Sequence, residues 1–338
     1  MTRQYRIYGL EMSPYSIKVR SWFRYKQLPH EWIGRSMERM PEFQSLARLP
    51  LVPLVQCPDG EVMQDSTPII EWLEARHPAP PTQPASPLLA FLSALIEEYA
   101  DEWLNKPMFH YRWSRPADCA SAALRIAREQ LPGQPDEQLA NMVAFLQQRM
   151  VPRLSLVGSS AETGPLIEQS FRQLLVRLEP LLAKRAYLFG ARPCLADFGL
   201  YGQLQQLASD PTPAALMKEH APATLAWLAR MDSPPAGTDT GGSSAPKDNP
   251  HADTEFDSEA ALLADLEPLL REQVLGYYLP WAQANEQAVA AGEEHFSVAL
   301  PGGLFTQQPQ KYHARSLAML RQRRAAVTVP LPDWLPAF

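Results

Sequence analysis

The sequence predicts an α/β domain at the N-terminus that is followed by an all-helical region. Within residues 1–78, short apolar strands alternate with amphipathic helices in the order β-α-β and then β-β-α. A proline-rich stretch at residues 79–86 has the composition of a linker. From residue 87 to residue 232, apolar side chains recur at helical spacing. We therefore expect two domains joined by a short linker.

The turn after the first strand carries a serine that we expect at the start of a helix. Residues 6–8 (Arg-Ile-Tyr) lead into this turn, and Ser13 precedes Pro14, a pairing typical of an N-cap and the first helical residue. Free N–H groups and the helix dipole favour an anion at such an end, and a thiolate is one such anion. Ser13 therefore either caps the helix only or also donates a hydrogen bond to a bound sulfur. This stretch alone favours neither interpretation.

Three further strands and a helix complete the first domain. Residues 31–33 form the second strand, and residues 54–56 and 61–63 flank a Cys-Pro-Asp-Gly turn that favours a hairpin. A helix then begins at Ser66 and ends at residues 77–78 (His-Pro). This order of elements is that of the thioredoxin-like fold.

Composition and charge exclude several classes of protein. The chain of 338 residues has a net charge of −6, which argues against binding to nucleic acid or to an anionic membrane surface. The cysteines, Cys57, Cys119 and Cys194, are far apart, and the seven histidines show no metal-ligand spacing, so we expect no metal. The N-terminus lacks an apolar signal region, and no apolar run reaches transmembrane length. We expect a cytoplasmic protein.

Three motifs in the first domain resemble those of the N-terminal domain of glutathione transferases. The first is Ser-Pro-Tyr-Ser at residues 13–16, in the position where thioredoxin relatives have CxxC. The second is Leu-Val-Pro-Leu at residues 51–54, which is similar to the family's VPxL. The third is residues 64–73, which are similar to ESxAIxxYL. Each motif alone is weak, but their order and spacing together are specific.

The resemblance implies a site for glutathione. The proline of the second motif is normally cis in the family, which points to Pro53. The main chain of the residue before it, here Val52, pairs with the cysteinyl part of glutathione in the family. The acidic residue and the serine of the third motif, here Asp65 and Ser66, hold the γ-glutamyl end. The glutathione site is therefore expected at these four residues and Ser13.

The resemblance also implies how the sulfur of glutathione is held. Ser13 takes the place of a hydrogen-bond donor that stabilises the thiolate, and it is neither a nucleophile nor a strong base. Tyr8, at the end of the first strand, is the second choice for this role, because some transferase classes use a tyrosine there. Since position 13 is not a cysteine, we do not expect mixed-disulfide chemistry of the glutaredoxin or omega type.

Elementary chemistry supports these contacts and shows one departure from the family. A strand edge with free main-chain groups pairs with an extended peptide. A carboxylate at Asp65 suits an ammonium group, and the hydroxyl and N–H groups at Ser66 suit a carboxylate, although a plain helix cap is the alternative. The lysine that often meets the glycyl carboxylate in the family is replaced by Leu51, and Arg48 is a cation that could substitute for it.

A pocket for a second substrate is expected in the helical region. Residues 87–113 read as one long amphipathic segment. Within it, Glu97 and Asp101 lie four residues apart on one helix face, which is either a solvated acidic surface or part of a pocket. The aromatic and imidazole side chains that we expect to line this second-substrate pocket are Trp103, His110 and Trp113.

A later segment resembles the capping box of the family. Residues 191–204 are similar to SxADxxLYxxL, in which a serine or threonine and an aspartate cap a helix reciprocally. Here Cys194 replaces the hydroxyl residue, which weakens half of the box. We therefore interpret Asp197 as a structural residue and not as a catalytic one.

The end of the chain departs from the family. Residues 233–258 are of low complexity and nearly free of apolar side chains, so we expect a flexible loop. Residues 259–338 are predicted to form an extension made of a helix to about residue 291, a short hairpin and a basic helix at residues 311–324. The resemblance therefore covers about the first two-thirds of the chain, and the extension could wrap the helical domain and narrow its pocket.

Together these observations predict an α/β thioredoxin-like N-terminal domain followed by an all-α glutathione-transferase-like domain, and a transferase-like activity. Glutathione is the expected co-substrate, and its thiolate would attack an electrophilic, apolar or aromatic small molecule. Two alternatives stay open: a non-catalytic binding or assembly module, and a glutathione-dependent isomerase or dehalogenase. The resemblance also implies a homodimer, unless the extension blocks that interface.

Overall fold

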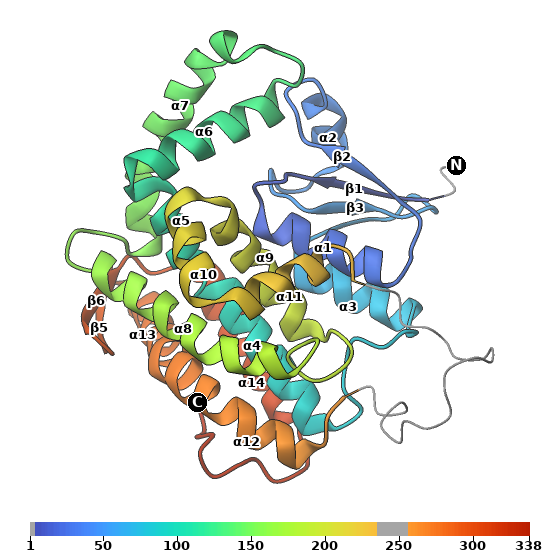
Figure 1. Ribbon diagram of the computed structural model, residues 1–338, viewed down its shortest axis with the longest axis vertical. Helices are drawn as coiled ribbons and strands as arrows, with labels where there is room; N and C mark the ends of the chain where they lie inside the picture. Colours follow the sequence, from blue (N-terminus) through green and yellow to red (C-terminus); the bar gives the residue numbers. More distant parts are fainter. Residues whose placement is uncertain (1–3, 235–255) are drawn as a thin grey trace.

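A four-stranded sheet with helices on both faces forms the first domain. The computed structural model describes residues 4–234 and 256–338. The strands follow the order β2-β1-β3-β4, with β1 parallel to β2 and antiparallel to β3, and β3 antiparallel to β4. In Figure 1, α1 and α3 lie between the sheet and the helical region, and α2 lies on the opposite face. The bounds are β1 (Tyr5–Gly9), α1 (Pro14–Tyr25), β2 (His30–Gly34), α2 (Met40–Leu46), β3 (Leu54–Gln56), β4 (Val62–Gln64) and α3 (Ser66–Arg76).

The helical region that follows confirms the predicted fold class. The predicted segment at residues 87–113 is divided into two helices, because the helix turns at Trp103 and Leu104. The bounds are α4 (Pro87–Glu102), α5 (Asn105–Ser114), α6 (Pro116–Gln130), η1 (Asp136–Gln138), α7 (Ala140–Met150), η2 (Val151–Val157), α8 (Gly164–Lys184), α9 (Leu195–Ser209), α10 (Pro211–His220) and α11 (Pro222–Asp232).

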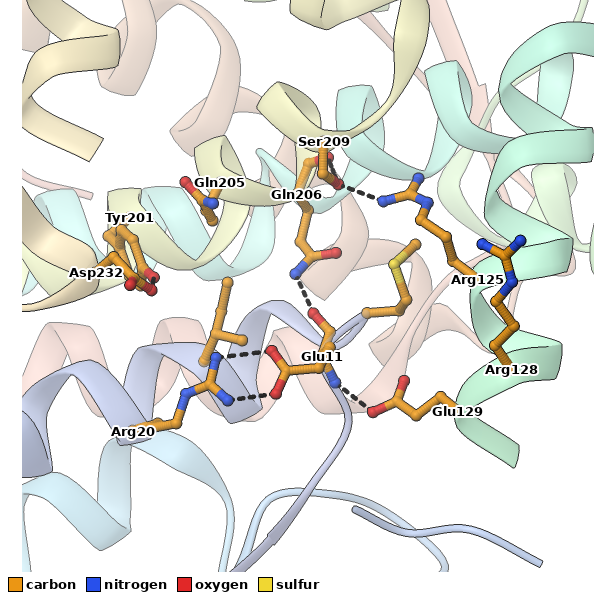
Figure 2. A pocket seen from close by; sticks show the side chains of 12 residues that line it. Glu11, Arg20, Arg125, Arg128, Glu129, Tyr201, Gln205, Gln206, Ser209 and Asp232 are labelled. Atoms are coloured by element: carbon orange, nitrogen blue, oxygen red, sulfur yellow. Dashed lines mark hydrogen bonds and ion pairs between the residues drawn. The ribbon is translucent and has the colours of Figure 1, made fainter. Parts of the chain in front are cut away.

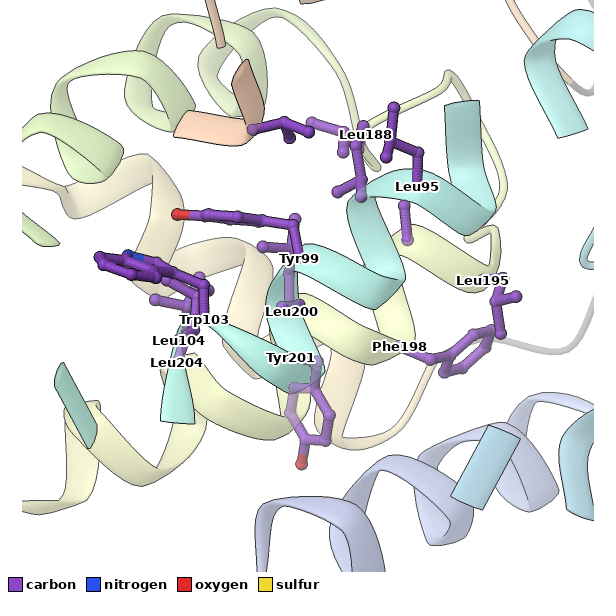
Figure 3. Close-up of a cluster of buried hydrophobic side chains, with 14 of the residues drawn as sticks. Leu95, Tyr99, Trp103, Leu104, Leu188, Leu195, Phe198, Leu200, Tyr201 and Leu204 are labelled. Atoms are coloured by element: carbon purple, nitrogen blue, oxygen red, sulfur yellow. The ribbon is translucent and has the colours of Figure 1, made fainter. Parts of the chain in front are cut away.

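Helix α9 joins the two parts of the molecule, since it packs against both α1 and α4. Two glycines permit this approach. A Cβ atom on Gly202 would lie 2.7 Å from the carbonyl oxygen of Pro14, and one on Gly199 would lie 3.0 Å from Cγ of Glu97. Figure 3 shows the apolar side chains of α4 and α9 that form the centre of the core, among them Leu95, Tyr99, Phe198 and Leu204.

The predicted helix, hairpin and basic helix of the extension are confirmed. The first helix is continuous and contains a π-helical stretch in its middle. The bounds are α12 (Glu259–Leu269), η3 (Leu270–Tyr278), α13 (Leu279–Ala291), β5 (Phe296–Leu300), β6 (Gly303–Gln307) and α14 (Lys311–Ala325). The extension packs along the helical region, and α14 contacts α4 and α13. Most of the segment predicted to be a flexible loop, residues 235–255, lies outside the described residues.

Candidate functional site

Ser13 caps helix α1, as the sequence predicts. Its backbone is extended, with φ of −103° and ψ of 116°, and its Oγ accepts a hydrogen bond from the N–H of Ser16 at 3.3 Å. The side chain is half-buried. Within the described part of the chain, no group accepts a hydrogen bond from the Ser13 hydroxyl, so its proton is free for another acceptor. An anion next to Ser13 would also lie at the positive end of the α1 dipole.

The loop that leads to Ser13 is fixed by contacts from three helices. Figure 2 shows these contacts around a cavity of about 370 Å³. Gln206 Nε2 donates to the carbonyl oxygen of Glu11 at 2.8 Å, and the N–H of Glu11 donates to Glu129 at 2.5 Å. The Glu11 carboxylate forms an ion pair with Arg20. Helices α1, α6 and α9 therefore hold the turn that positions Ser13.

Val52 presents free main-chain groups next to Pro53. The peptide bond between the two residues is cis, as the resemblance implies. Val52 is half-buried and Pro53 is buried. Across residues 4–234 and 256–338, no hydrogen bond uses the N–H or C=O of Val52. An extended peptide could pair with both groups, as in the addition of a strand to a sheet edge.

A glutamine that sequence reasoning missed holds the segment before Val52. The Gln64 amide accepts hydrogen bonds from the N–H groups of Arg48 and Leu49 at 2.8 and 3.1 Å. It also donates to the carbonyl oxygens of Leu49 and Leu51 at 2.8 and 2.9 Å. Gln64 is the first residue of the third motif, directly before Asp65. The motif therefore drew attention to its position, but not to its role in holding the segment before Val52.

Arg48 and Leu51 both lie on the surface. Leu51 is 61 % exposed, which is unusual for a large apolar side chain. The Arg48 side chain is exposed, and it forms no ion pair with any described residue. Arg48 is therefore available to an external carboxylate, whereas Leu51 offers none of the charge that the family has at this position.

Asp65 and Ser66 lie at the N-terminus of α3. Asp65 has φ of 79° and ψ of 127°, a backbone conformation that residues other than glycine rarely adopt. Such backbone conformations cluster at functional sites. Ser66 is the first residue of α3 and is buried. Desolvation raises the pKa of Asp65, and a hydrogen bond from Tyr312 opposes this effect.

The hydroxyl of Tyr8 already donates a hydrogen bond to another residue, so Tyr8 does not suit the role of an alternative donor to the thiolate. The side chain is fully buried, and its hydroxyl donates to Oε1 of Glu42 in α2 at 2.9 Å. Burial and the Glu42 carboxylate raise the pKa of Tyr8 to about 12. A phenol that already donates its proton to a carboxylate has none left for a thiolate.

The predicted second-substrate pocket is not formed by the three residues together. Trp103 is fully buried in the helical core, where its indole N–H donates to Ser170 at 3.3 Å. His110 and Trp113 do line a common cavity, of about 470 Å³, which lies between α5, η2 and the start of α8. His110 there contacts Ser159 at 2.8 Å and Glu168 at 3.2 Å. The prediction was wrong for Trp103, because helical spacing does not reveal which part of the chain covers a given helix face.

A buried network of ion pairs and hydrogen bonds joins α1, α3 and α4. The sequence predicted only that Glu97 and Asp101 of this network share one helix face. Lys18 of α1 is fully buried and donates to Thr67 of α3 at 3.1 Å. It also forms ion pairs with Glu97 and Asp101 of α4. The acidic face on α4 is therefore not a solvated surface, because Lys18 pairs with both carboxyl groups inside the protein, and Asp101 also borders a crevice between α3, α4 and residues 312–323.

Comparison with known proteins supports the predicted fold class. Residues 7–81 match the family described as Glutathione S-transferase, N-terminal domain. Beta-etherase LigF from Sphingobium sp. strain SYK-6 has a similar structure, with 22 % identity and a TM-score of 0.51 over 69 % of this chain and 96 % of LigF. At this identity the likeness shows the fold.

A second solved structure also aligns. It is a glutathione S-transferase from Methylobacterium radiotolerans in complex with glutathione sulfonate, with 21 % identity and a TM-score of 0.43 over 68 % of this chain and 91 % of that one. No curated protein sequence matches the chain. No helix in the described ranges is long and apolar enough to cross a membrane.

Proposed function

We propose that the chain binds glutathione and adds its thiolate to an electrophile, because residues 7–81 match the family model of the glutathione S-transferase N-terminal domain. The main observation in support is the unused N–H and C=O of Val52, which can pair with the cysteinyl residue of an extended tripeptide. Ser13 and Asp65 lie at the N-termini of two helices of the same domain, α1 and α3. Val52 therefore suits the cysteinyl middle of one glutathione molecule, Ser13 suits its sulfur, and Asp65 suits its γ-glutamyl end.

The thiolate would be stabilised by Ser13 and by the N-terminus of α1. The free hydroxyl proton of Ser13 supplies a hydrogen bond to the sulfur, and the helix dipole favours its negative charge. Both effects lower the pKa of the bound thiol, so a larger fraction of it is nucleophilic at neutral pH. The electrophile is attacked directly by sulfur, and Ser13 forms no covalent bond.

The electrophile would meet an apolar surface on the helical side. Met12, next to Ser13, packs in a cluster with Trp113 and Phe109 of α5. A ligand seated against this cluster would be apolar or aromatic, since it replaces contacts of that kind. Holding both reactants in place supplies much of the rate enhancement.

A second function, binding without catalysis, is favoured by one observation. Leu51 is exposed where the family often has a lysine for the glycyl carboxylate, so the site has lost one charge. A weakened site on this fold would suit a binding or assembly module. Isomerisation or dehalogenation with glutathione would use the same residues as conjugation and is distinguished only by its product.

Calorimetry and a conjugation assay on the same variants test the proposal. Wild type should bind glutathione at millimolar concentration or below, and Ser13→Ala should retain binding but lose at least about tenfold in turnover with an aromatic electrophile. The control is Ser297→Ala, an exposed serine of β5 far from the site along the chain. Absence of binding heat would overturn the proposal. Binding without conjugation by wild type would favour the non-catalytic module.

A further inference from the structure

Helix α14 of the extension lies over the N-terminus of α3, next to Asp65. Between them is a crevice of about 220 Å³, which is large enough for a small organic group, given roughly 30 Å³ for one water molecule. Its walls come from α3, α4 and α14. The residues that matter for the argument are Asp65, Thr67, Glu98, Glu102, Tyr312 and Arg315.

Specific contacts hold α14 in this position. His313 contacts the Glu102 carboxylate, and Ser316 donates to Glu98, both on α4. Arg323 forms an ion pair with Glu71 of α3 at 2.5 Å. Leu317 of α14 is fully buried in the core. Because polar and apolar contacts both fix the helix, its residues are in place to line the crevice before a ligand arrives.

The crevice places the Asp65 carboxyl group on one side and a guanidinium group on the other. The α3 and α4 sides carry carboxyl groups, including Asp65, whose Oδ2 accepts a hydrogen bond from the Tyr312 hydroxyl at 3.2 Å. The α14 side carries Arg315, which is exposed and forms no ion pair with any residue that the structure describes. A carboxylate facing an unpaired guanidinium is the arrangement that recognises an α-amino acid group, which has both charges.

We propose that α14 forms a wall of the glutathione site, where Arg315 binds the α-carboxylate of the γ-glutamyl group and Tyr312 competes with its ammonium for Asp65. This inference rests on the proposed function and adds to it the residues that select a γ-glutamyl thiol. The first turn of α3 and Arg315 would bind the carboxylate from two sides. The ammonium would displace the Tyr312 hydroxyl from Asp65.

The two α14 residues should therefore have opposite effects on affinity. Arg315→Ala removes a charged contact and should weaken glutathione binding by about tenfold, whereas Arg315→Lys should restore part of it. Tyr312→Phe leaves Asp65 free and should tighten binding by a fewfold. Lys311→Ala is the matched control, because it removes a positive charge from the same helix at an exposed position outside the crevice.

The test measures, by calorimetry on the full chain, the Kd of glutathione and of cysteinylglycine, which lacks the γ-glutamyl group. The expected result is that Arg315→Ala weakens binding of glutathione and leaves that of the dipeptide unchanged. Equal weakening of both ligands, or no weakening of either while wild type binds glutathione, would overturn the inference. If wild type does not bind glutathione, the proposed function fails and this inference fails with it. Circular dichroism of each variant checks that the fold is retained.

Discussion

Lys18 Nζ lies 2.6 Å from Oδ2 of Asp101, and both side chains are withdrawn from water, with 0 % and 10 % of their surface exposed. The pair joins α1 of the first domain to α4 of the helical region. Burial lowers the pKa of Lys18, but the ion pairs with Asp101 and Glu97 outweigh it and raise this pKa above its ordinary value. Since Lys18 also donates to Thr67 in α3, it fixes the helices that carry Ser13 and Asp65 relative to each other.

Replacing Lys18 with methionine should destabilise the protein strongly. The substitution keeps a long side chain but leaves two buried carboxyl groups without their cation, which typically costs about 3–5 kcal/mol. Urea denaturation measures the change in the free energy of unfolding. Lys184→Met is the control, because Lys184 is 66 % exposed and its ion pair with Asp265 spans 4.0 Å, so the change should stay below about 1 kcal/mol. Equal effects of both substitutions would contradict the assigned role of Lys18.

Glu98 should make the stability depend on pH. Burial, followed by the charges of Glu102 and Glu97, raises the pKa of Glu98 to about 8 in the folded protein. The folded state therefore binds more protons than the unfolded state between its ordinary pKa of about 4.5 and about 8, and the contribution of Glu98 to stability is lost as the pH rises through this window.

The variant Glu98→Gln should flatten this dependence. It keeps the shape of the side chain and can still accept hydrogen bonds from Tyr278 and Ser316, but it has no proton to lose. Urea unfolding at pH 5, 6.5 and 8 should show that the variant gains stability relative to wild type as the pH rises. A constant difference across the three pH values would be evidence against a raised pKa.

Asp197 should be a structural residue whose loss is costly. It is fully buried, and its carboxylate accepts hydrogen bonds from the N–H groups of Leu188 and Cys194 at 2.9 and 3.0 Å and from the Trp227 indole at 3.0 Å. Asp197→Asn replaces an acceptor by a donor at the centre of this network and should destabilise by about 3 kcal/mol or more.

Cys194→Ser should act in the opposite direction. A hydroxyl is a better partner than a thiol in a capping box, and the thiol donates to Asp197 at 3.3 Å. The serine variant should therefore gain about 0.5–1 kcal/mol in thermal or urea unfolding. Destabilisation by serine would mean that packing of the buried sulfur outweighs the cap.

Gly202 should be required for the position of Ser13. Gly202→Ala places a methyl group 2.7 Å from the carbonyl oxygen of Pro14, so α1 and α9 must move apart, at a cost of about 1–3 kcal/mol. The Kd of glutathione should rise as well, because a shift of Pro14 also moves Ser13, the helix cap directly before it. Gly34→Ala is the control, since no atom lies within 4 Å of its added Cβ. Weaker binding in both variants would indicate a general effect of alanine and not a local one.

Local signals in the sequence were sufficient for most of the helices and strands and for part of the site. Ser13 before Pro14 marked the start of α1, and the third motif placed Asp65 and Ser66 at the start of α3. Both helix starts reflect the unpaired N–H groups at a helix N-terminus. The residues that satisfy these groups are close neighbours in the sequence, so the sequence alone can reveal them. The spacing of leucines also predicted the helix at residues 259–291, although the chain there matched no motif of the family.

The sequence by itself determined the fold class, the order of the strands in the first domain, and which residues begin the helices around the candidate site, but it predicted neither α2 nor the division between α4 and α5. Only the tertiary structure decided that Lys18 lies between Glu97 and Asp101, that Trp103 is buried, and that Tyr312 contacts Asp65. The physical reason is that periodicity and caps arise from contacts within a few residues, whereas Tyr312 and Asp65 are 247 positions apart. Hydrophobic patterning shows which face of a helix is covered, but not which part of the chain covers it.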